Sequence, residues 1–197
     1  MNRWYQQIQR QAVPGIFLWI LLSIAMPLAA KADQDLWEKL REGSHHVLLR
    51  HAIAPGTGDP AEFAIGDCDT QRNLSASGRD QAKRIGARFR ANGIEDAQVF
   101  SSQWCRCLDT ATLLGLGNVE ELPFLNSFFR RVERRGRQTE ALNDWLNDAS
   151  YDKPLVMVTH QVNITALTGV YPTSGELVIV HVDANGAVSV AGTIETE

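Results

Sequence analysis

The sequence predicts an α/β sandwich built around a mainly parallel sheet. Short apolar runs alternate along the chain with segments whose apolar residues recur at helical spacing, which is the order typical of such folds. The run LVMVT at 155–159 is almost wholly apolar, as expected for a strand covered on both faces. In sheets of this kind ligands bind at the carboxyl ends of the strands, so residues that follow the apolar runs are candidates for a site.

The first 32 residues have the features of a signal peptide. Two arginines precede an apolar stretch at 16–26, and Ala30-Lys31-Ala32 fits a small-x-small cleavage site. We therefore expect a signal peptide at 1–32 and one domain at 33–197, periplasmic or secreted, with no stable membrane span after cleavage. The alternative is an uncleaved membrane anchor, because residues 11–30 carry no charge.

Charge and length limit the class of the mature domain. Removing residues 1–32 takes away three basic residues and no acidic one, so the formal net charge changes from −4 to −7. A general nucleic-acid-binding protein would instead carry a basic surface, so we expect no nucleic-acid partner. About 165 residues are sufficient for one domain with its own core.

Each expected element follows from a local pattern. Ser75 is a helix N-cap residue and Gly93 a helix stop, with apolar residues on one face between them. Asn185-Gly186 is a strong turn signal between two apolar runs. Residues 52–73 are rich in Gly, Pro and Asp and form a loop long enough to suggest a functional role. We expect helices at 35–42, 75–92, from about 104, and at 139–149, and strands at 46–51, 99–101, 119–122, 155–159, 177–182 and 187–194.

Three cysteines, Cys68, Cys105 and Cys107, lie in the mature part. In an exported protein one disulfide and one free thiol are expected, with Cys68 joined to Cys105 or to Cys107. The alternative is three unpaired, mostly buried thiols. A lone Cys-x-Cys spacing is a poor zinc signal, and no metal site is expected.

Cationic and imidazole side chains follow three of the predicted strands. Arg50 and His51 end the first strand, Arg106 lies in the first turn of the helix after the strand at 99–101, and His160 follows the run at 155–159. A guanidinium beside a histidine lowers the pKa of the imidazole and keeps it neutral for nucleophilic attack. Arginine also binds phosphate by paired hydrogen bonds, and a helix N-terminus attracts the same anion.

The ordered set of motifs resembles the histidine phosphatase superfamily, also called phosphoglycerate mutase-like. The pieces are LLRHA at 48–52, NLSASGRDQA at 73–82, SQWCRCLDTA at 102–111 and VTHQ at 158–161. The resemblance implies a three-layer α/β sandwich with a mainly parallel central sheet. It also implies an enzyme, a metal-independent phosphatase that needs no cofactor and acts on a small phosphorylated substrate.

The resemblance also implies roles for individual residues. His51 would be the nucleophile and form a phosphohistidine, while Arg50, Arg106 and His160 would bind the phosphoryl oxygens and stabilise the transition state. The expected reaction is hydrolysis of a phosphomonoester or a phosphoramidate. The rivals are a non-catalytic phosphate-binding relative and an isomerising mutase, the latter disfavoured by export.

The sequence departs from the family pattern at the proton donor. Ser127 stands where one branch has Glu, and Gln161 and Val162 stand where the other branch has an acid. Neither serine nor glutamine is a useful general acid near neutral pH. Either another carboxylate serves, or the natural leaving group needs no proton, as in a phosphohistidine or an acyl phosphate. The candidate carboxylates are Asp59, Asp67 and Glu121.

A basic run, RRVERRGR at 130–137, follows this position. It could bind an anionic substrate, although a solvated arginine surface is the simpler interpretation. His45, His46 and His181 are interpreted as structural or exposed.

Overall fold

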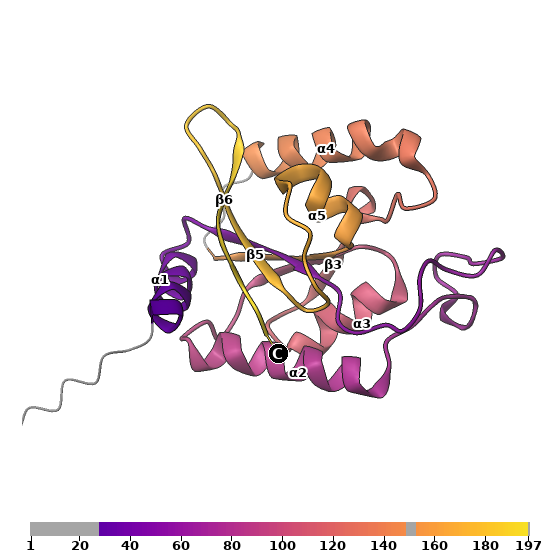
Figure 1. Ribbon diagram of the computed structural model, residues 1–197, viewed down its shortest axis with the longest axis horizontal. Coiled ribbons are helices and arrows are strands. Elements are labelled where there is room, and N and C mark those ends of the chain that lie inside the picture. The colour runs from indigo at the N-terminus through magenta and orange to yellow at the C-terminus, as the bar shows by residue number, and fades with distance from the viewer. Residues whose placement is uncertain (1–27, 149–152, 197) are drawn as a thin grey trace, which may run out of the picture.

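A six-stranded sheet crosses the middle of the computed structural model, which describes residues 28–148 and 153–196 (Figure 1). The strands are β1 (His46–Arg50), β2 (Gln98–Ser101), β3 (Val119–Glu121), β4 (Leu155–Thr159), β5 (Leu177–Val182) and β6 (Val188–Ile194). Their order in the sheet is β3-β2-β4-β1-β5-β6. The first four are parallel, whereas β5 pairs antiparallel with both β1 and β6. The predicted mainly parallel sheet is confirmed.

Helices cover both faces of the sheet and complete the predicted three-layer sandwich. The helices are α1 (Leu28–Arg41), α2 (Ala76–Ala91), α3 (Cys105–Leu114), α4 (Arg135–Asp148) and α5 (Gln161–Thr168). In Figure 1, α2 and α3 lie below the sheet and α4 and α5 above it. One core cluster joins α1, α2 and α3 to the sheet, and a second joins α4 and α5 to the opposite face.

Strand β4 shows how the sequence fills both cores. Val156 and Val158 point into the first cluster, and Leu155 and Met157 point into the second. All four side chains are fully buried, as the continuous apolar run predicts. The alternation follows from the period of two along a strand.

Most predicted elements are present, and the differences have local causes. The hydroxyl of Ser75 accepts a hydrogen bond from the Gly78 amide at 3.0 Å and caps α2 as predicted. Helix α5 was not predicted, because its eight residues, QVNITALT, mix polar and β-branched residues without helical periodicity. Helix α4 begins at Arg135 rather than at 139, with an entirely polar first turn.

The predicted signal peptide lies largely outside the described residues. Helix α1 begins at Leu28 and therefore contains the predicted cleavage site, where Ala and Lys are strong helix formers. Its packing face is Leu36, Trp37 and Leu40, all beyond that site. No helix within residues 28–148 and 153–196 is long and apolar enough to cross a membrane.

The strand register brings three strand ends to one place. Arg50 pairs with Thr159 across β1 and β4, and Ser101 pairs with Val158 across β2 and β4. The residues that follow these strands are therefore neighbours at the carboxyl edge, and the His51 amide donates to the Thr159 carbonyl at 3.0 Å.

Candidate active site

Two histidines and an arginine from three segments meet at this edge. Arg106 Nε donates to His51 Nε2 at 3.2 Å, and Arg106 Nη2 lies 3.3 Å from His160 Nδ1. The centroids of the two imidazole rings are 5.5 Å apart, and the ring planes meet at 69°. All three side chains are buried, although each lines a small open pocket of about 170 Å³. The structure thus brings together His51, Arg106 and His160, as the sequence predicts.

The contacts of His51 define its tautomer. Nδ1 lies 2.8 Å from the Ala52 carbonyl, which can only accept, so Nδ1 carries the proton. Nε2 therefore keeps its lone pair, to which Arg106 donates. Burial, and then the positive charge of Arg106, lower the pKa of His51 to about 3. The ring is neutral near pH 7, with a free nucleophilic nitrogen toward the arginine.

His160 is oriented by a chain of hydrogen bonds behind it. Its Nε2 lies 2.9 Å from Ser102 Oγ, and the Ser102 hydroxyl donates to Asn126 Oδ1 at 3.1 Å. In this arrangement Nε2–H donates to the serine and Nδ1 accepts from Arg106. Burial and the charge of Arg106 also hold the pKa of His160 well below its usual value. Ser102 and Asn126 are thus positioning residues for the second imidazole.

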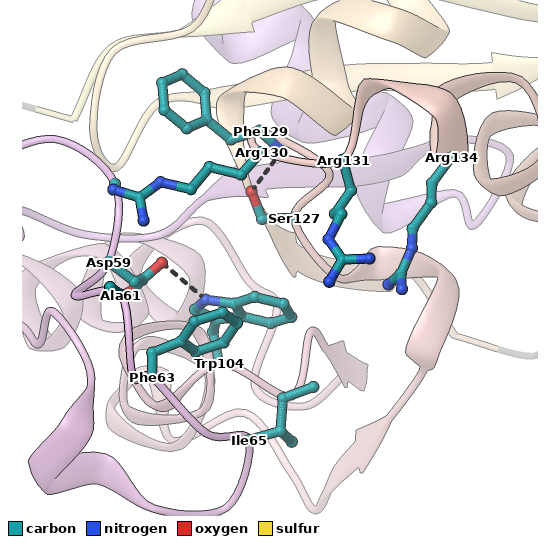
Figure 2. A pocket seen from close by; sticks show the side chains of 11 residues that line it. Asp59, Ala61, Phe63, Ile65, Trp104, Ser127, Phe129, Arg130, Arg131 and Arg134 are labelled. Carbon is teal, nitrogen blue, oxygen red and sulfur yellow. Dashed lines mark hydrogen bonds between the residues drawn. The ribbon is translucent and has the colours of Figure 1, made fainter.

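The guanidinium of Arg106 binds a carboxylate as well as the two histidines. Nη1 lies 2.7 Å from Asp59 Oδ1, and Nη2 lies 3.3 Å from Asp59 Oδ2 (side-chain exposures 3% and 10%). Asp59 also accepts from the Trp104 indole at 3.0 Å and from the Arg72 amide at 3.2 Å (Figure 2 shows the bond to Trp104). Burial alone would raise the pKa of Asp59, but the hydrogen bonds and charge of Arg106 outweigh it and lower the pKa.

Two further arginines line the same pocket. Arg50 donates to the Pro172 carbonyl at 2.8 Å, and its buried Nε has no hydrogen-bond partner among the described residues. Arg72 donates to the carbonyls of Gly58 and Ala54 and so holds the loop that carries Asp59. Burial lowers the pKa of both guanidinium groups from a very high starting value, so both remain cations. Together with Arg106 they provide three positive charges around the His51 ring.

Of the three candidate proton donors, only Asp59 lines the pocket of His51. Asp59 lines the pocket, whereas Asp67 caps a short turn in the exposed part of the loop and Glu121 is exposed beside Gln103. Asp67 and Glu121 are therefore wrong as candidates in this arrangement. Ser127 lines the pocket, as do Gln161 and Val162.

The structure selects one of the two disulfides left open by the sequence. Cys68 is bonded to Cys105, and Cys107 is free and buried. Burial raises the pKa of the Cys107 thiol to about 12, so the group is a neutral core residue. The disulfide joins the loop that carries Asp59 to the first turn of α3, next to Arg106.

Sequence reasoning missed several pocket residues. Arg72 and Tyr171 lie in irregular segments where no periodic pattern marks them, although Arg72 lies next to the NLSASGRDQA motif. The rings of His45 and His181 lie 5.0 Å apart, and neither residue lines the pocket. Within residues 28–148 and 153–196, no group of three or more histidine, cysteine or carboxylate side chains is placed to hold a metal ion.

Comparison with known proteins gives a family match and a set of shared folds. The family model "Histidine phosphatase superfamily (branch 1)" matches residues 46–127. The protein histidine phosphatase SixA, in complex with tungstate, has a TM-score of 0.54 at 18% identity, covering 77% of this chain and 97% of its own. Phosphoserine phosphatase of Entamoeba histolytica, in complex with 3-phosphoglyceric acid, has a TM-score of 0.55 at 14% identity, covering 78% and 98%.

A mycobacterial glucosyl-3-phosphoglycerate phosphatase has a TM-score of 0.50 at 17% identity, covering 73% of this chain and 92% of its own. No curated protein matches the chain by sequence. The structural likenesses at this identity establish the fold, and the family match covers the strand with Arg50 and His51 and the helix with Arg106. The match to the histidine phosphatase superfamily thus covers residues 46–127, and the fold around it is shared with solved structures that include the protein histidine phosphatase SixA.

Proposed function

We propose that this protein is an exported phosphatase that hydrolyses a phosphomonoester or a phosphoramidate through a phosphohistidine on His51. The observation that carries the proposal is the neutral His51 ring, whose Nδ1–H is held by a backbone carbonyl and whose Nε2 meets a buried guanidinium. The match to the histidine phosphatase superfamily supports a phosphatase activity. The arginine-lined pocket also has the charge and the size to hold a phosphoryl group.

In the first step, His51 Nε2 attacks phosphorus. The N–P bond forms while the bond from phosphorus to the leaving oxygen or nitrogen breaks, and the leaving group takes the electron pair. Arg50, Arg72 and Arg106 stabilise the negative charge on the phosphoryl oxygens, and His160 provides a further contact. In the second step, a water oxygen bonds to phosphorus and its proton passes to solvent, while the N–P bond breaks and its electron pair returns to Nε2.

The ion pair between Asp59 and Arg106 must break when a phosphoryl group binds to Arg106. Its carboxylate uses the same two-point face of the guanidinium that a phosphate would use. A dianion on Arg106 would remove the interaction that lowers the pKa of Asp59, and would leave a carboxyl group at the pocket wall. We propose Asp59 as the proton donor for leaving groups that need one.

Turnover of p-nitrophenyl phosphate in the presence of a chelator tests the phosphatase assignment. We expect nitrophenol release by the protein lacking residues 1–32 and none by His51→Ala. Binding of inorganic phosphate or vanadate without turnover of any ester would favour the non-catalytic relative, and loss of activity with chelator would exclude a metal-free reaction. A much slower reaction with an alkyl phosphate would mean that no acid acts at the leaving group.

Export is tested by the N-terminus of the protein made in cells. We expect it to begin at Asp33, which lies 3.8 Å from Arg88 in an ion pair and precedes the packing face of α1. A chain that retains Met1 and stays with the membrane fraction would be the anchored form.

A further inference from the structure

A second hollow opens next to the candidate active site. This side cleft has a volume of about 500 Å³, and its lining includes three arginines, Arg130, Arg131 and Arg134, and the apolar side chains of Phe63, Ile65, Trp104 and Phe129. Gly58, Asp59, Ser127 and Phe129 line both the side cleft and the pocket of His51. A group attached to a phosphate in that pocket would therefore extend into the side cleft.

The arginines of the side cleft are charged groups without acidic partners. Among residues 28–148 and 153–196, no carboxylate forms an ion pair with Arg130, Arg131 or Arg134. Figure 2 shows the side chains of Arg131 and Arg134 extending in the same direction, toward the part of the hollow that Trp104 and Ile65 line. Arg130 extends instead toward the loop with Asp59, where its Nη2 packs against Gly58.

The basic run is divided by the fold. Arg135 and Arg137 line two other surface hollows and do not line the side cleft. A short 3-10 turn, Val132–Arg134, separates Arg130 and Arg131 from Arg135 at the start of α4. Arg130, Arg131 and Arg134 are exposed like the rest of the run, but these three arginines also share one hollow next to the candidate active site.

The opposite wall of the side cleft is aromatic and apolar. Phe63 lies over Trp104 with ring centroids 5.2 Å apart and planes tilted by 32°. Ile65 beside them is 49% exposed. Phe129, which lies where the side cleft meets the pocket of His51, is 51% exposed. A large apolar side chain left in water at the edge of a charged site is typical of a ligand-binding surface.

We propose, on the basis of the proposed function, that the side cleft binds the leaving group of the substrate, and that this group carries a planar aromatic part and a second anionic group. The aromatic part packs against Phe63 and the edge of Trp104, as rings do on aromatic platforms. The second anion binds Arg131 and Arg134, whose forked donors suit phosphate or carboxylate oxygens.

Equilibrium binding to the His51→Ala protein tests this without turnover, with ribose 5-phosphate, adenosine 5′-monophosphate and adenosine 3′,5′-bisphosphate as probes. We expect the monophosphate to bind about fivefold or more tightly than ribose 5-phosphate, because of stacking. We expect the bisphosphate to bind about tenfold or more tightly than the monophosphate, because of the added charge-assisted hydrogen bonds.

Two variants on the same background locate the effect. Arg131→Gln with Arg134→Gln should reduce the advantage of the bisphosphate to about threefold or less. Arg135→Gln with Arg137→Gln, which removes the same two charges outside the side cleft, should preserve that advantage. Equal affinity for the two nucleotides, or an equal loss in the control, would overturn the proposal.

The proposed function and the proposed role of the side cleft can be contradicted by different results. If the protein with His51 hydrolyses no phosphate ester while the binding preference persists, the proposed function is wrong and the side cleft stands. If p-nitrophenyl phosphate is hydrolysed but the bisphosphate has no advantage, the side cleft alone is wrong.

Discussion

Asp59 and Arg106 form a buried, two-point ion pair in the middle of the candidate active site, with Nη1 to Oδ1 at 2.7 Å and Nη2 to Oδ2 at 3.3 Å. The carboxylate therefore occupies the face of Arg106 that a phosphoryl group would need. An anionic ligand has to compete with a side chain of the protein itself.

Replacing Asp59 with Asn should make phosphate binding tighter and the ligand-free protein less stable. The Arg72 amide and the Trp104 indole donate to different oxygens of Asp59, so the single oxygen of asparagine can accept from only one of them, and the amide no longer neutralises Arg106. We expect a loss of about 1.5–3 kcal/mol in the free energy of unfolding, the usual contribution of hydrogen bonds to charged groups. Inorganic phosphate should restore this stability, because it binds only the folded state.

Urea unfolding with and without phosphate measures both effects. Asp67→Asn is the matched control, because Asp67 lies in the same loop and keeps its capping oxygen, but does not line the pocket. Weaker phosphate binding by Asp59→Asn would show that the ion pair builds the anion site rather than competing with it.

Replacing Arg106 with Lys should lower kcat/KM for p-nitrophenyl phosphate by about 100-fold or more, the usual effect of losing a donor to transition-state charge. A lysine keeps the charge but cannot contact His51, His160 and a phosphoryl oxygen from one planar group. Arg79→Lys, at an exposed ion pair with Asp109, should leave kcat/KM unchanged. A decrease of only a few-fold for Arg106→Lys would contradict the role of the guanidinium.

Acid should destabilise the protein through its buried neutral histidines. Burial lowers the pKa of His51 to about 3 and that of His46 to about 4, and it also lowers the pKa of His160. Below about pH 6.5 the unfolded chain gains protons that the folded chain does not, so stability present above pH 6.5 is lost as the pH falls toward 3. Each such histidine contributes a slope of about 1.4 kcal/mol per pH unit in that range.

His51→Gln should remove one of these contributions. Urea unfolding at pH 7.5, 6, 5 and 4 should therefore show a shallower decrease for the variant than for the parent protein. Identical pH dependence would mean that folding does not lower the pKa of His51.

Breaking the Cys68–Cys105 disulfide should destabilise the fold and loosen the loop that carries Asp59. The bond closes a segment with a sequence separation of 37, for which chain entropy gives about 4 kcal/mol. Cys68→Ser should lower stability by up to that amount, and dithiothreitol should lower the parent protein to the same level. Dithiothreitol should not change the stability of Cys68→Ser. A further decrease in the stability of this variant would show that the reductant acts on a group other than the disulfide.

Much of the candidate active site follows from the sequence. Apolar runs with strand composition end at His51 and His160, and a helix begins just before Arg106. Parallel neighbours end at one edge, so these residues meet once the strands pair. Helix α5 lacks a sequence signal, and it forms because the fold gives Ile164 a buried position.

The loop at 52–73 is where the sequence alone is insufficient. Its path depends on contacts with distant residues, including the bond from the Cys105 amide to Gln71 and the ion pair of Asp59 with Arg106. The choice of disulfide partner also depends on the tertiary structure. Cys105 and Cys107 are two residues apart on α3 and therefore project from different sides of the helix, so only its orientation on the sheet directs Cys105 to Cys68 and Cys107 into the core.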